Sequence, residues 1–407
     1  MQNHDDTTTA PPEHTENAAT DPTDDFTVTP YDIEGEVDYN RLLDRFGADR
    51  LTPEQVARFS APPHRLLRRE RIFAGRDVDR FLDAAAAGEE VSVVTGIGPS
   101  GPMHVGHLSQ FYFAKHLQDE FGARVYIPLS DDEKHLLKDL TLDETATHLR
   151  DNLRDLLAVG FDPELTRIVV DTADADALYP TAVRLAKGLT PATVEAVYGD
   201  PANVGVGFYP AMQATHLLLP QLVHGAHPTA VPVAVDQDPH VRVCRDLAAK
   251  ARFDVEKPGA LLSKFLPRLG GGGGKMSSSE DVPGILLSDD RETVHEKVQR
   301  HAFSGGQDDL EAHRELGGNP EVDVAYQLLY AFFETDDAVL ERLAREYRAG
   351  DLLSGELKTY AADRISDFLE AHRERRPADG RDELREAVAS YRLREDERRR
   401  LRHDPLS

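Results

Sequence analysis

The chain has 407 residues, of which 73 are acidic and 47 are basic, and its formal net charge is −26. This length allows two or three domains, and the single cysteine, Cys244, excludes an internal disulfide or a multi-cysteine zinc site and is expected to be a small buried apolar residue. The sequence has neither an apolar run of about 18 residues nor a charged-then-apolar leader, so we expect a cytoplasmic protein without a membrane-spanning helix.

The acidic surplus is unusual for a partner of nucleic acid, because phosphate binding normally requires a basic face. Lysine is scarce beside arginine and tryptophan is absent, a profile typical of proteins in a salt-rich cytoplasm. Molar salt shortens the screening length to about 3 Å, so self-repulsion weakens while the carboxylates keep the surface hydrated. The composition therefore favours a halophilic protein, with an ordinary acidic enzyme as the alternative.

The N-terminal quarter of the chain divides into two parts. Residues 1–25 are rich in Thr, Asp, Glu and Pro and almost lack large apolar side chains, which predicts a disordered acidic tail. Residues 26–90 are expected to form an extension that packs on the next domain. Its basic run either faces a nucleic acid or forms a helix whose arginines pair with acids. The arginines in question are Arg65, Arg68, Arg69 and Arg71.

The middle of the chain alternates strand-like apolar runs with helix-like stretches. The apolar runs are residues 91–94, 125–129, 167–170 and 231–235. This alternation predicts an α/β domain over about 91–290, with a Rossmann-like parallel sheet and helices on both faces. Residues 141–215 have mainly helical periodicity and are expected to be an insertion in this domain. Ligands of such sheets bind beyond the carboxyl ends of the strands, so we expect the functional site there.

The remainder of the chain has an almost entirely helical pattern. Apolar residues recur at helical spacing in 324–333 and 338–347, which predicts a separate all-α domain over 291–407. The stretch 392–402 is dense in Arg and Glu. It is expected to be a solvated or frayed helix, with a contact to RNA as the alternative.

The sequence HVGH at 104–107 follows a strand-like run and a Gly/Pro turn and begins a helix-like stretch over 108–121. The motif therefore lies at a helix N-terminus, where free N–H groups and the helix dipole favour an anion. Two imidazoles one turn apart, His104 and His107, can bind phosphate oxygens, and Gly106 leaves room for a flat base. A helix start with two surface histidines is the alternative interpretation.

A second motif, KMSSS at 275–279, follows the glycine run 270–274. Its lysine is a point charge on a loop, and such a loop can close over the charge that develops on a leaving pyrophosphate. Alone, the motif is more typical of a solvated loop. Together and in this order, the two motifs favour adenylation chemistry.

The two motifs resemble those of class I aminoacyl-tRNA synthetases. The segments DDEK at 131–134, VDQDP at 235–239 and HAFSGG at 301–306, with EAHRELGGN at 311–319, look like tryptophanyl-tRNA synthetase of the archaeal and eukaryotic type. The resemblance extends over about 26–376, and the Phe303–Gly306 motif favours this family over tyrosyl-tRNA synthetase. It implies that ATP and tryptophan form an aminoacyl-adenylate and that the acyl group then passes to tRNA. It also implies a homodimer and an anticodon-binding role for the helical domain.

The resemblance assigns roles to individual residues. The candidate catalytic residues, at the phosphates and the departing pyrophosphate, are His104, His107, Lys275, Ser277 and Ser278. The candidate ATP-binding residues are Gly96, Gly98, Pro99, Gly106, Asp236, Met276 and Ser279. The candidate amino-acid-binding residues are Glu133, Gln213, Gln237, Val94 and Pro128. Mg²⁺ is expected to bridge phosphate oxygens of ATP through waters, so no protein metal site is expected.

The chain departs from the family where the indole N–H is bound. The family has a tyrosine and a glutamine at the positions of Val94 and Pro128. A buried indole N–H without an acceptor loses about 1–3 kcal/mol, which weakens selection about tenfold to a hundredfold. Either Tyr126, Ser130 or Asp131 is a substitute acceptor, or the chain prefers another amino acid.

Three alternative functions therefore stay open beside tryptophan charging. They are a ligase for tyrosine or another aromatic amino acid, a synthetase-like protein that binds RNA or nucleotide without charging, and a plain nucleotidyltransferase. The intact lysine motif argues against the second, and the extra helical domain argues against the third.

Overall fold

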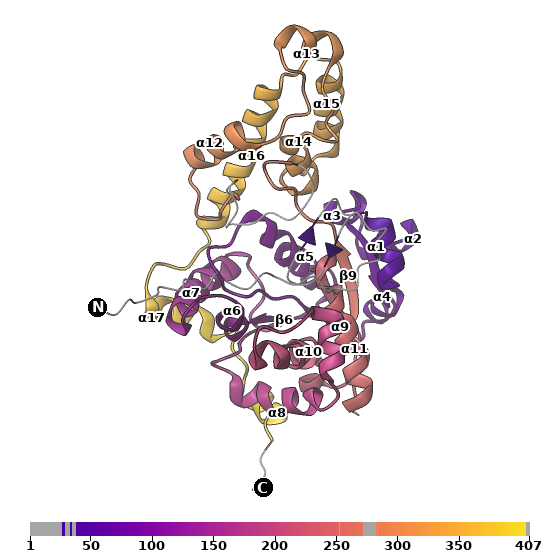
Figure 1. The fold of residues 1–407 in the computed structure, drawn as a ribbon, viewed down its shortest axis with the longest axis vertical. Helices are drawn as coiled ribbons and strands as arrows, with labels where there is room; N and C mark the ends of the chain where they lie inside the picture. The colour runs from indigo at the N-terminus through magenta and orange to yellow at the C-terminus, as the bar shows by residue number, and fades with distance from the viewer. Residues whose placement is uncertain are drawn as a thin grey trace, which may run out of the picture.

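The computed structural model describes residues 27–28, 33–34, 38–251, 253–271, 282 and 284–403. Its lower part in Figure 1 is built around a β-sheet, and its upper part is an arm of helices in orange and yellow. The predicted α/β class with a largely parallel sheet is confirmed. None of the described helices combines the length and apolarity that crossing a bilayer requires.

Seven strands form the central sheet, in the order β3-β4-β9-β8-β5-β6-β7. Their bounds are β3 (Asp49–Arg50), β4 (Ile72–Arg76), β5 (Ser92–Val94), β6 (Arg124–Leu129), β7 (Thr166–Val170), β8 (Thr229–Ala234) and β9 (Gly259–Ser263). Strands β5 to β9 are parallel, whereas β3 and β4 extend the sheet in antiparallel fashion beside β9. The four predicted runs correspond to β5, β6, β7 and β8, and the sequence patterns do not predict β3, β4 or β9. A separate antiparallel pair, β1 (Thr27–Val28) and β2 (Ile33–Glu34), precedes the sheet.

Helices cover both faces of the sheet. Their bounds are α1 (Tyr39–Phe46), α2 (Pro53–Phe59), α3 (Arg65–Arg68), α4 (Val78–Ala87), α5 (Val105–Phe121), α6 (Asp131–Leu137), α7 (Leu142–Ala158), α8 (Ala175–Ala186), α9 (Pro191–Tyr198), α10 (Val204–His224) and α11 (Asp238–Ala251). The arm holds α12 (Arg291–His301), α13 (Leu310–Leu316), α14 (Val324–Leu328), the π-helix η2 (Leu329–Phe333), α15 (Asp337–Arg348) and α16 (Ser354–Arg373), and α17 (Arg381–Ala389) and α18 (Glu395–Leu401) follow.

The alternation of side chains along the strands produces two apolar cores. On β6, Val125, Ile127 and Leu129 belong to the core that includes α5, whereas Tyr126 belongs to the core that includes α10. Successive side chains of a strand point to opposite faces, so a strand between two helical layers is buried on both sides. Cys244 of α11 is fully buried in the second core, as the sequence predicts.

The helical arm shares the first core with α5. The ring of Tyr112 packs edge-on against Phe332 and Phe368, with centroids 6.0 and 5.3 Å away. Its hydroxyl lies 3.0 Å from Nδ1 of the buried His372. Phe332 belongs to one continuous apolar cluster, and Tyr112 and Phe368 pack against it, so packing fixes the arm against the sheet part.

The chain beyond α16 leaves the arm and returns to the sheet part, where α17 lies against α7 and α18 against α8 and α10 (Figure 1). Nε of Arg167 on β7 lies 2.7 Å from Oε2 of Glu397, and both side chains are buried. Arg392 and Arg398 both bond to the buried Asp174. The stretch 392–402 is therefore bonded to the sheet part through some of its side chains, whereas others, including Glu395 and Arg399, are exposed as predicted. Its contact with RNA stays a prediction.

The predicted domain boundaries stay predictions, and two observations bear on them. Strand β7 lies inside the stretch 141–215 that was expected to be a helical insertion, because its buried apolar residues pair with β6. Helices α17 and α18 lie inside the predicted all-α domain 291–407 but pack on the sheet part. The predicted acidic tail, residues 1–25, lies outside the described residues.

The arginines of the basic run in the N-terminal extension contact other parts of the protein. Nη2 of Arg69 lies 2.5 Å from Oδ1 of Asp337, and Nε of Arg68 lies 2.6 Å from Oδ2 of the same residue. The guanidinium of Arg65 lies 4.6 Å from the centre of the Phe332 ring, and Arg71 bonds to the carbonyl of Phe265. Pairing with an acid is therefore confirmed for Arg68 and Arg69, and the interpretation as an RNA-binding strip stays a prediction.

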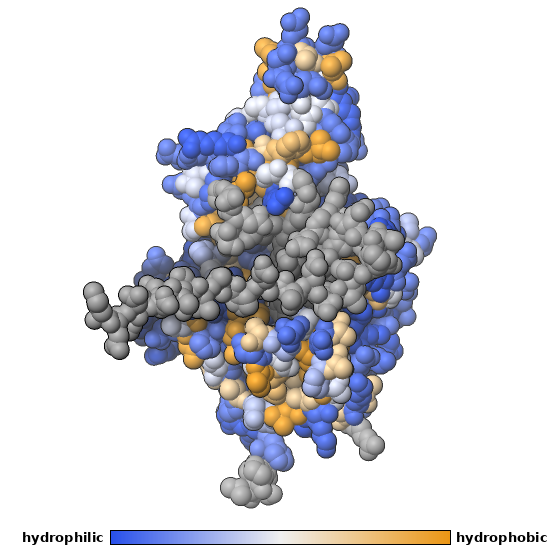
Figure 2. All heavy atoms as spheres, viewed as in Figure 1, coloured by the Kyte–Doolittle hydropathy of each residue, from blue (hydrophilic) through white to orange (hydrophobic). Residues whose placement is uncertain are grey.

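Figure 2 shows that hydrophilic side chains cover much of the face in view, as the acidic composition predicts. Some large apolar side chains are nevertheless exposed on the sheet part and on the arm. They are Leu142, Tyr179, Val183, Val204, Phe303, Leu310, Leu316, Val322 and Tyr330.

Candidate active site

The carboxyl ends of the parallel strands gather most of the predicted site residues at one edge of the sheet. The loop after β5 holds Gly96 and Gly98, α6 after β6 holds Glu133, and the short helix η1 (Val235–Gln237) after β8 holds Asp236 and Gln237. Helix α10, which carries Gln213, packs against β5, β6 and β8 and against α6. The sheet topology therefore brings together residues up to about 140 positions apart, as expected for this class of sheet.

The two histidines form the N-terminal cap of α5, as the sequence predicts. Nδ1 of His104 accepts a hydrogen bond from the N–H of Gly106 at 3.1 Å, and Nδ1 of His107 accepts one from the N–H of His104 at 3.3 Å. The two rings stack with centroids 3.7 Å apart. This reciprocal cap satisfies two N–H groups at the helix start and fixes both rings. Their role toward phosphates stays a prediction.

The loop after β5 lies directly on the DDEK segment. A Cβ at Gly96 would lie 2.3 Å from the carbonyl oxygen of Pro128, and one at Gly98 would lie 2.0 Å from Cε of Lys134. The N–H of Ile97 donates to the Pro128 carbonyl at 3.1 Å and so continues the pairing of β5 with β6. Protein packing thus requires a glycine at Gly96, where the contact is with backbone, whereas at Gly98 the Lys134 side chain could move. Nucleotide contact by the two glycines and by the buried Pro99 stays a prediction.

The predicted residues of the lysine motif, Lys275, Met276, Ser277, Ser278 and Ser279, lie outside the described residues. The described segment that follows them pairs with the histidine turn. The N–H of Val105 donates to the carbonyl of Ile285 at 3.0 Å, and the N–H of Leu287 donates to that of Met103 at 3.0 Å. The chain therefore resumes next to the start of α5.

Asp131 and Glu133, which follow β6, are buried and are bonded to neighbouring groups. Both carboxylate oxygens of Asp131 accept hydrogen bonds from Thr172, one from its N–H and one from its hydroxyl. Oε2 of Glu133 lies 2.7 Å from Nζ of Lys134. Glu133 is thus at the strand edge with a cationic neighbour, and its predicted contact with the amino acid stays a prediction.

Three further polar residues lie beside these acids and are not indicated by the sequence motifs. They are Asp171, Tyr209 and His216. Nε2 of His216 lies 2.7 Å from Oδ1 of Asp171, and both side chains are buried. The hydroxyl of Tyr209 lies 2.8 Å from both Oγ of Ser130 and Oε1 of Gln213. The position of Asp171 directly after β7 was the available signal, because polar groups that follow parallel strands share this edge.

Burial shifts the protonation of this group toward neutral forms. Burial, and next the charge of Asp171, raise the pKa of Asp132 to about 8. Burial also raises the pKa of Asp171 well above its usual range and lowers that of His216 to about 4. Two carboxyls that share a low-dielectric site do not both ionise readily, so the pair retains a proton near neutral pH.

The loop after β8 is held by an ion pair that the motifs do not predict. Asp238, which is fully buried, accepts two hydrogen bonds of 2.8 Å from the guanidinium of Arg76 on β4. Asp236 is also buried, and one of its carboxylate oxygens accepts a hydrogen bond from Nε2 of Gln237 at 3.1 Å. The bidentate pair fixes the start of α11 and therefore the position of Asp236 and Gln237.

The side chains of Val94 and Pro128 are buried and apolar, so neither accepts a hydrogen bond. Of the suggested substitutes, Tyr126 directs its hydroxyl to Nε2 of His224 at 3.0 Å, and Asp131 is occupied by Thr172. Ser130 is paired with Tyr209. The hydroxyl pair of Ser130 and Tyr209 keeps acceptor capacity, because a hydroxyl oxygen has two lone pairs.

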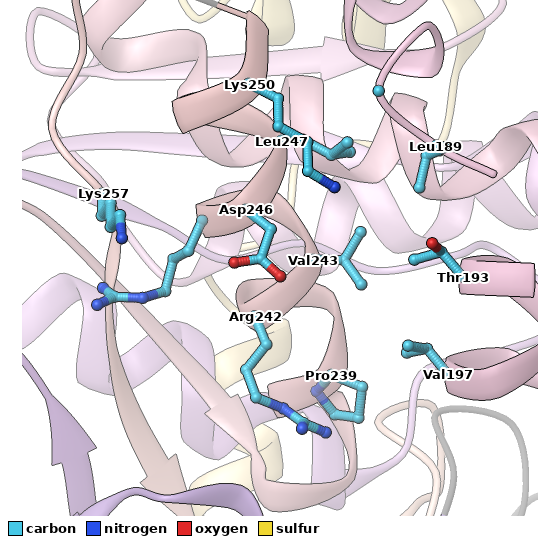
Figure 3. Close-up of a pocket in the computed structure, with 12 residues that line it drawn as sticks. Leu189, Thr193, Val197, Pro239, Arg242, Val243, Asp246, Leu247, Lys250 and Lys257 are labelled. Carbon is cyan, nitrogen blue, oxygen red and sulfur yellow. The ribbon is translucent and has the colours of Figure 1, made fainter.

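A cavity of about 280 Å³ lies outside this group, between α9 and α11 (Figure 3). Arg242, Asp246 and Lys250 extend from α11 toward it, and Thr193 and Val197 lie on the opposite side. None of the predicted site residues lines it. We therefore place the candidate active site at the strand edge and not in this cavity.

Comparison with known proteins identifies close relatives of this chain. The sequence profile of the family "tRNA synthetases class I (W and Y)" matches residues 86–370. "Tryptophan--tRNA ligase 2" of Halobacterium salinarum is 62% identical over 92% of this chain and 96% of its own length. "Tryptophan--tRNA ligase, cytoplasmic" of Saccharomyces cerevisiae is 38% identical over 92% and 91%, respectively. The solved tryptophanyl-tRNA synthetase of Giardia lamblia has a TM-score of 0.79 and 32% identity, covering 88% of this chain and 96% of its own.

Proposed function

The chain belongs to the class I tRNA synthetases of the tryptophan and tyrosine group, and we propose that it activates tryptophan with ATP and charges tRNA with it. The observation that carries this proposal is the 62% identity to a tryptophan–tRNA ligase over 92% of the chain. The histidine cap at the start of α5 and the polar side chains at the carboxyl edge of the sheet support it, because their chemistry suits phosphates and an amino acid, respectively. A cytoplasmic location follows from this function.

Activation requires no nucleophile from the protein. The carboxylate of the amino acid attacks the α-phosphorus of ATP, pyrophosphate leaves, and the protein must align the two substrates and stabilise charge on the phosphates. In this proposal His104 and His107 bind the phosphates at the start of α5, and Gly106 lies under the adenine. Asp236, after β8, accepts from the ribose hydroxyls or helps to hold the amino-acid end.

The lysine motif completes the phosphate side of the proposal. Lys275, Ser277 and Ser278 bind the departing pyrophosphate, and Met276 and Ser279 contact ATP. The pairing of Ile285 and Leu287 with the histidine turn supports this, because it anchors the described end of that segment beside the start of α5.

Magnesium enters the proposal with ATP. Among the described residues, no group of three or more His, Cys, Asp or Glu side chains is arranged to hold a metal ion. The ion would be held mainly by phosphate oxygens and waters, with few protein ligands. It would neutralise charge on the triphosphate.

The amino-acid side of the site comprises Glu133, Gln213 and Gln237, with Val94 and Pro128 as its apolar strand wall. A carboxylate beside two amides suits an α-amino group and a carboxylate, since each finds a complementary partner. The buried valine and proline suit the apolar part of an aromatic ring.

The arm provides the proposed contact with the anticodon of tRNA, and we propose that the protein is a homodimer. Exposed apolar side chains on α8 and at the start of α10 support a second copy, among them Tyr179 at 59% and Val204 at 90% exposure. A second chain that covers them would remove apolar area from water. Light scattering at high salt gives the mass directly.

The test of the function is amino-acid-dependent exchange of pyrophosphate into ATP, with tryptophan, tyrosine and phenylalanine separately in potassium-rich buffer. We expect exchange with tryptophan and a kcat/KM at least about tenfold lower with the other two. A preference for tyrosine would assign the chain to the other branch of the group. Exchange with none of the three would contradict the proposed activity.

A further inference from the structure

One face of α10 carries three polar side chains that connect the amino-acid side of the site to the end of β7. Tyr209, Gln213 and His216 are spaced four and three residues apart, so they lie on the same side of the helix. Oε1 of Gln213 lies 2.8 Å from the Tyr209 hydroxyl and 3.4 Å from Nδ1 of His216. Nε2 of His216 lies 2.7 Å from Oδ1 of Asp171. The chain of contacts therefore runs from Gln213 through the imidazole to Asp171.

The donors and acceptors among Tyr209, Gln213, His216 and Asp171 determine where the protons of these hydrogen bonds lie. An amide oxygen only accepts, so the Tyr209 hydroxyl and Nδ1–H of His216 both donate to Gln213. A neutral imidazole has one N–H, so Nε2 of His216 must then accept, and the proton between it and Asp171 belongs to the carboxyl. The raised pKa of Asp171 and the lowered pKa of His216, both caused chiefly by burial, agree with two neutral groups.

This arrangement occupies the oxygen of the Gln213 amide and directs its nitrogen elsewhere. No described residue accepts a hydrogen bond from Nε2 of Gln213, which is only partly buried, whereas His216 and Asp171 are almost completely buried. The two amide N–H donors are therefore available to a ligand at the strand edge. The imidazole itself has no exposed surface with which to contact one.

We propose that His216, supported by Asp171, is a positioning residue of the amino-acid site, which fixes the side-chain amide of Gln213 for contact with the substrate. The inference rests on the proposed function, because it takes Gln213 to contact the amino acid. It adds two residues to the site that do not touch substrate. The imidazole acts only through the amide that it orients.

The test compares the steady-state pyrophosphate exchange kinetics of His216→Leu, His216→Asn and the wild type. The asparagine variant keeps a donor near the position of Nδ1, whereas leucine keeps none. We expect the KM for tryptophan to rise about tenfold in His216→Leu, the equivalent of one lost hydrogen bond, and to recover largely in His216→Asn. The kcat and the KM for ATP should change less than about threefold.

A double-mutant cycle tests whether His216 acts through Gln213. In a Gln213→Ala background, His216→Leu should raise the KM for tryptophan no further. His372→Leu is the matched control, because His372 is equally buried between a tyrosine hydroxyl and Asp155 but lies where the arm joins α5. Its KM for tryptophan should equal that of the wild type.

Two results would overturn the inference and indicate general damage to the fold. One is that His216→Leu raises the KM for tryptophan as much in the Gln213→Ala background as in the wild type. The other is an equal rise in the KM for ATP. If His216→Leu does not fold, the KM for tryptophan of His216→Asn is compared with that of His216→Gln. Glutamine places its amide near the position of Nε2, so it should not replace the donor at Nδ1. A KM for tryptophan that is close to the wild-type value in His216→Gln but not in His216→Asn would also overturn the inference. Wild-type exchange with tryptophan separates these outcomes from a failure of the proposed function.

Discussion

The Lys275 side chain is the residue on which the proposed chemistry of the phosphate side depends most directly. A contact that strengthens as charge develops on the leaving pyrophosphate stabilises the transition state more than the ground state. We predict that Lys275→Ala lowers the rate of adenylate formation by about a hundredfold or more and changes ATP affinity by less than about threefold. Single-turnover kinetics and equilibrium binding of ATP measure the two quantities. An equal loss in both would mean that the lysine makes only a ground-state contact.

We predict that the Tyr209 hydroxyl accepts a hydrogen bond from the indole N–H of tryptophan. It is buried beside Ser130, while Val94 and Pro128 provide no acceptor. We predict that Tyr209→Phe lowers kcat/KM for tryptophan about tenfold, because a buried N–H then lacks an acceptor. Tyr126→Phe is the control, since that hydroxyl bonds to His224. Pyrophosphate exchange measures both variants.

A tryptophan analogue without the ring N–H separates two explanations for a loss in Tyr209→Phe. If the hydroxyl accepts from the indole, the analogue should react equally well with the wild type and the variant. An equal loss with the analogue would show that Tyr209 acts only on Gln213.

The candidate site was predictable from sequence where a residue and its partners are neighbours in the chain. The capping by His104 and His107 involves residues within three positions, so the motif alone locates it. The contact of Asp171 with His216 joins residues 45 positions apart. Only the packing of α10 beside β7 brings these two together, and no local pattern contains that information.

At the scale of elements, α3 and the loop after it join the N-terminal extension to α15 of the arm. The side chain of Arg69 is 3% exposed and that of Asp337 is 48% exposed. Removal of the carboxylate leaves a buried guanidinium with fewer partners, although solvent moderates the loss at the Asp337 end. We predict that Asp337→Asn lowers the free energy of unfolding by about 1–2 kcal/mol.

Urea denaturation measures this effect, and Glu321→Gln is the control because its pair with Arg348 is exposed on both sides. The hydrogen bond from Arg68 lowers the pKa of Asp337. The contribution is therefore fully present above the carboxyl pKa of the unfolded chain and is lost as the pH falls through the lower pKa of the folded state. A difference between Asp337→Asn and wild type that persists at acidic pH would contradict this assignment.

The element α18 is held by the ion pair of Arg167 and Glu397, whose side chains are 2% and 4% exposed. Removing one partner of a buried pair leaves an uncompensated charge, which costs about 3–5 kcal/mol. We predict that Glu397→Ala lowers the free energy of unfolding by about 3 kcal/mol, measured by urea denaturation. Glu395→Ala, at an exposed position on the same helix, should cost less than about 0.5 kcal/mol. Similar small losses in both variants would indicate that α18 contributes little to the fold.

The elements that the sequence patterns predict are those whose own apolar spacing identifies them. β6 and β8 are six-residue strands with buried apolar side chains, and α5 begins at a recognisable cap. β3 has two exposed residues, and it is a strand only because β4 lies beside it. The polar surface of α18 predicts solvent contact, but the residues that pair with it, Arg167 of β7 and Asp176 of α8, are more than 200 residues earlier in the chain.

At the scale of the whole molecule, the chain crosses between the two parts more than once. It leaves the sheet part for the arm at α12 and returns at α17 (Figure 1). Because α5 shares its core with α16, the histidine cap and the arm are connected through one helix. The proposed anticodon contact and the proposed phosphate site are therefore joined by packed elements. No property of the sequence alone predicts this connection.

The net charge of −26 predicts a stability that increases with salt. Salt screens both attractive pairs and repulsion, but exposed pairs contribute only about 0–1 kcal/mol each, and the 73 acids exceed the 47 bases. Relief of repulsion therefore outweighs the weakening of pairs. We predict that the Tm rises by about 10 °C or more between about 0.1 M and about 2 M KCl, where the screening length falls from about 10 Å to below 3 Å. The control is a series of Tm measurements with a neutral osmolyte at matched water activity. An equal rise of the Tm in both series would show that exclusion of the solute from the protein surface, and not charge screening, is the cause.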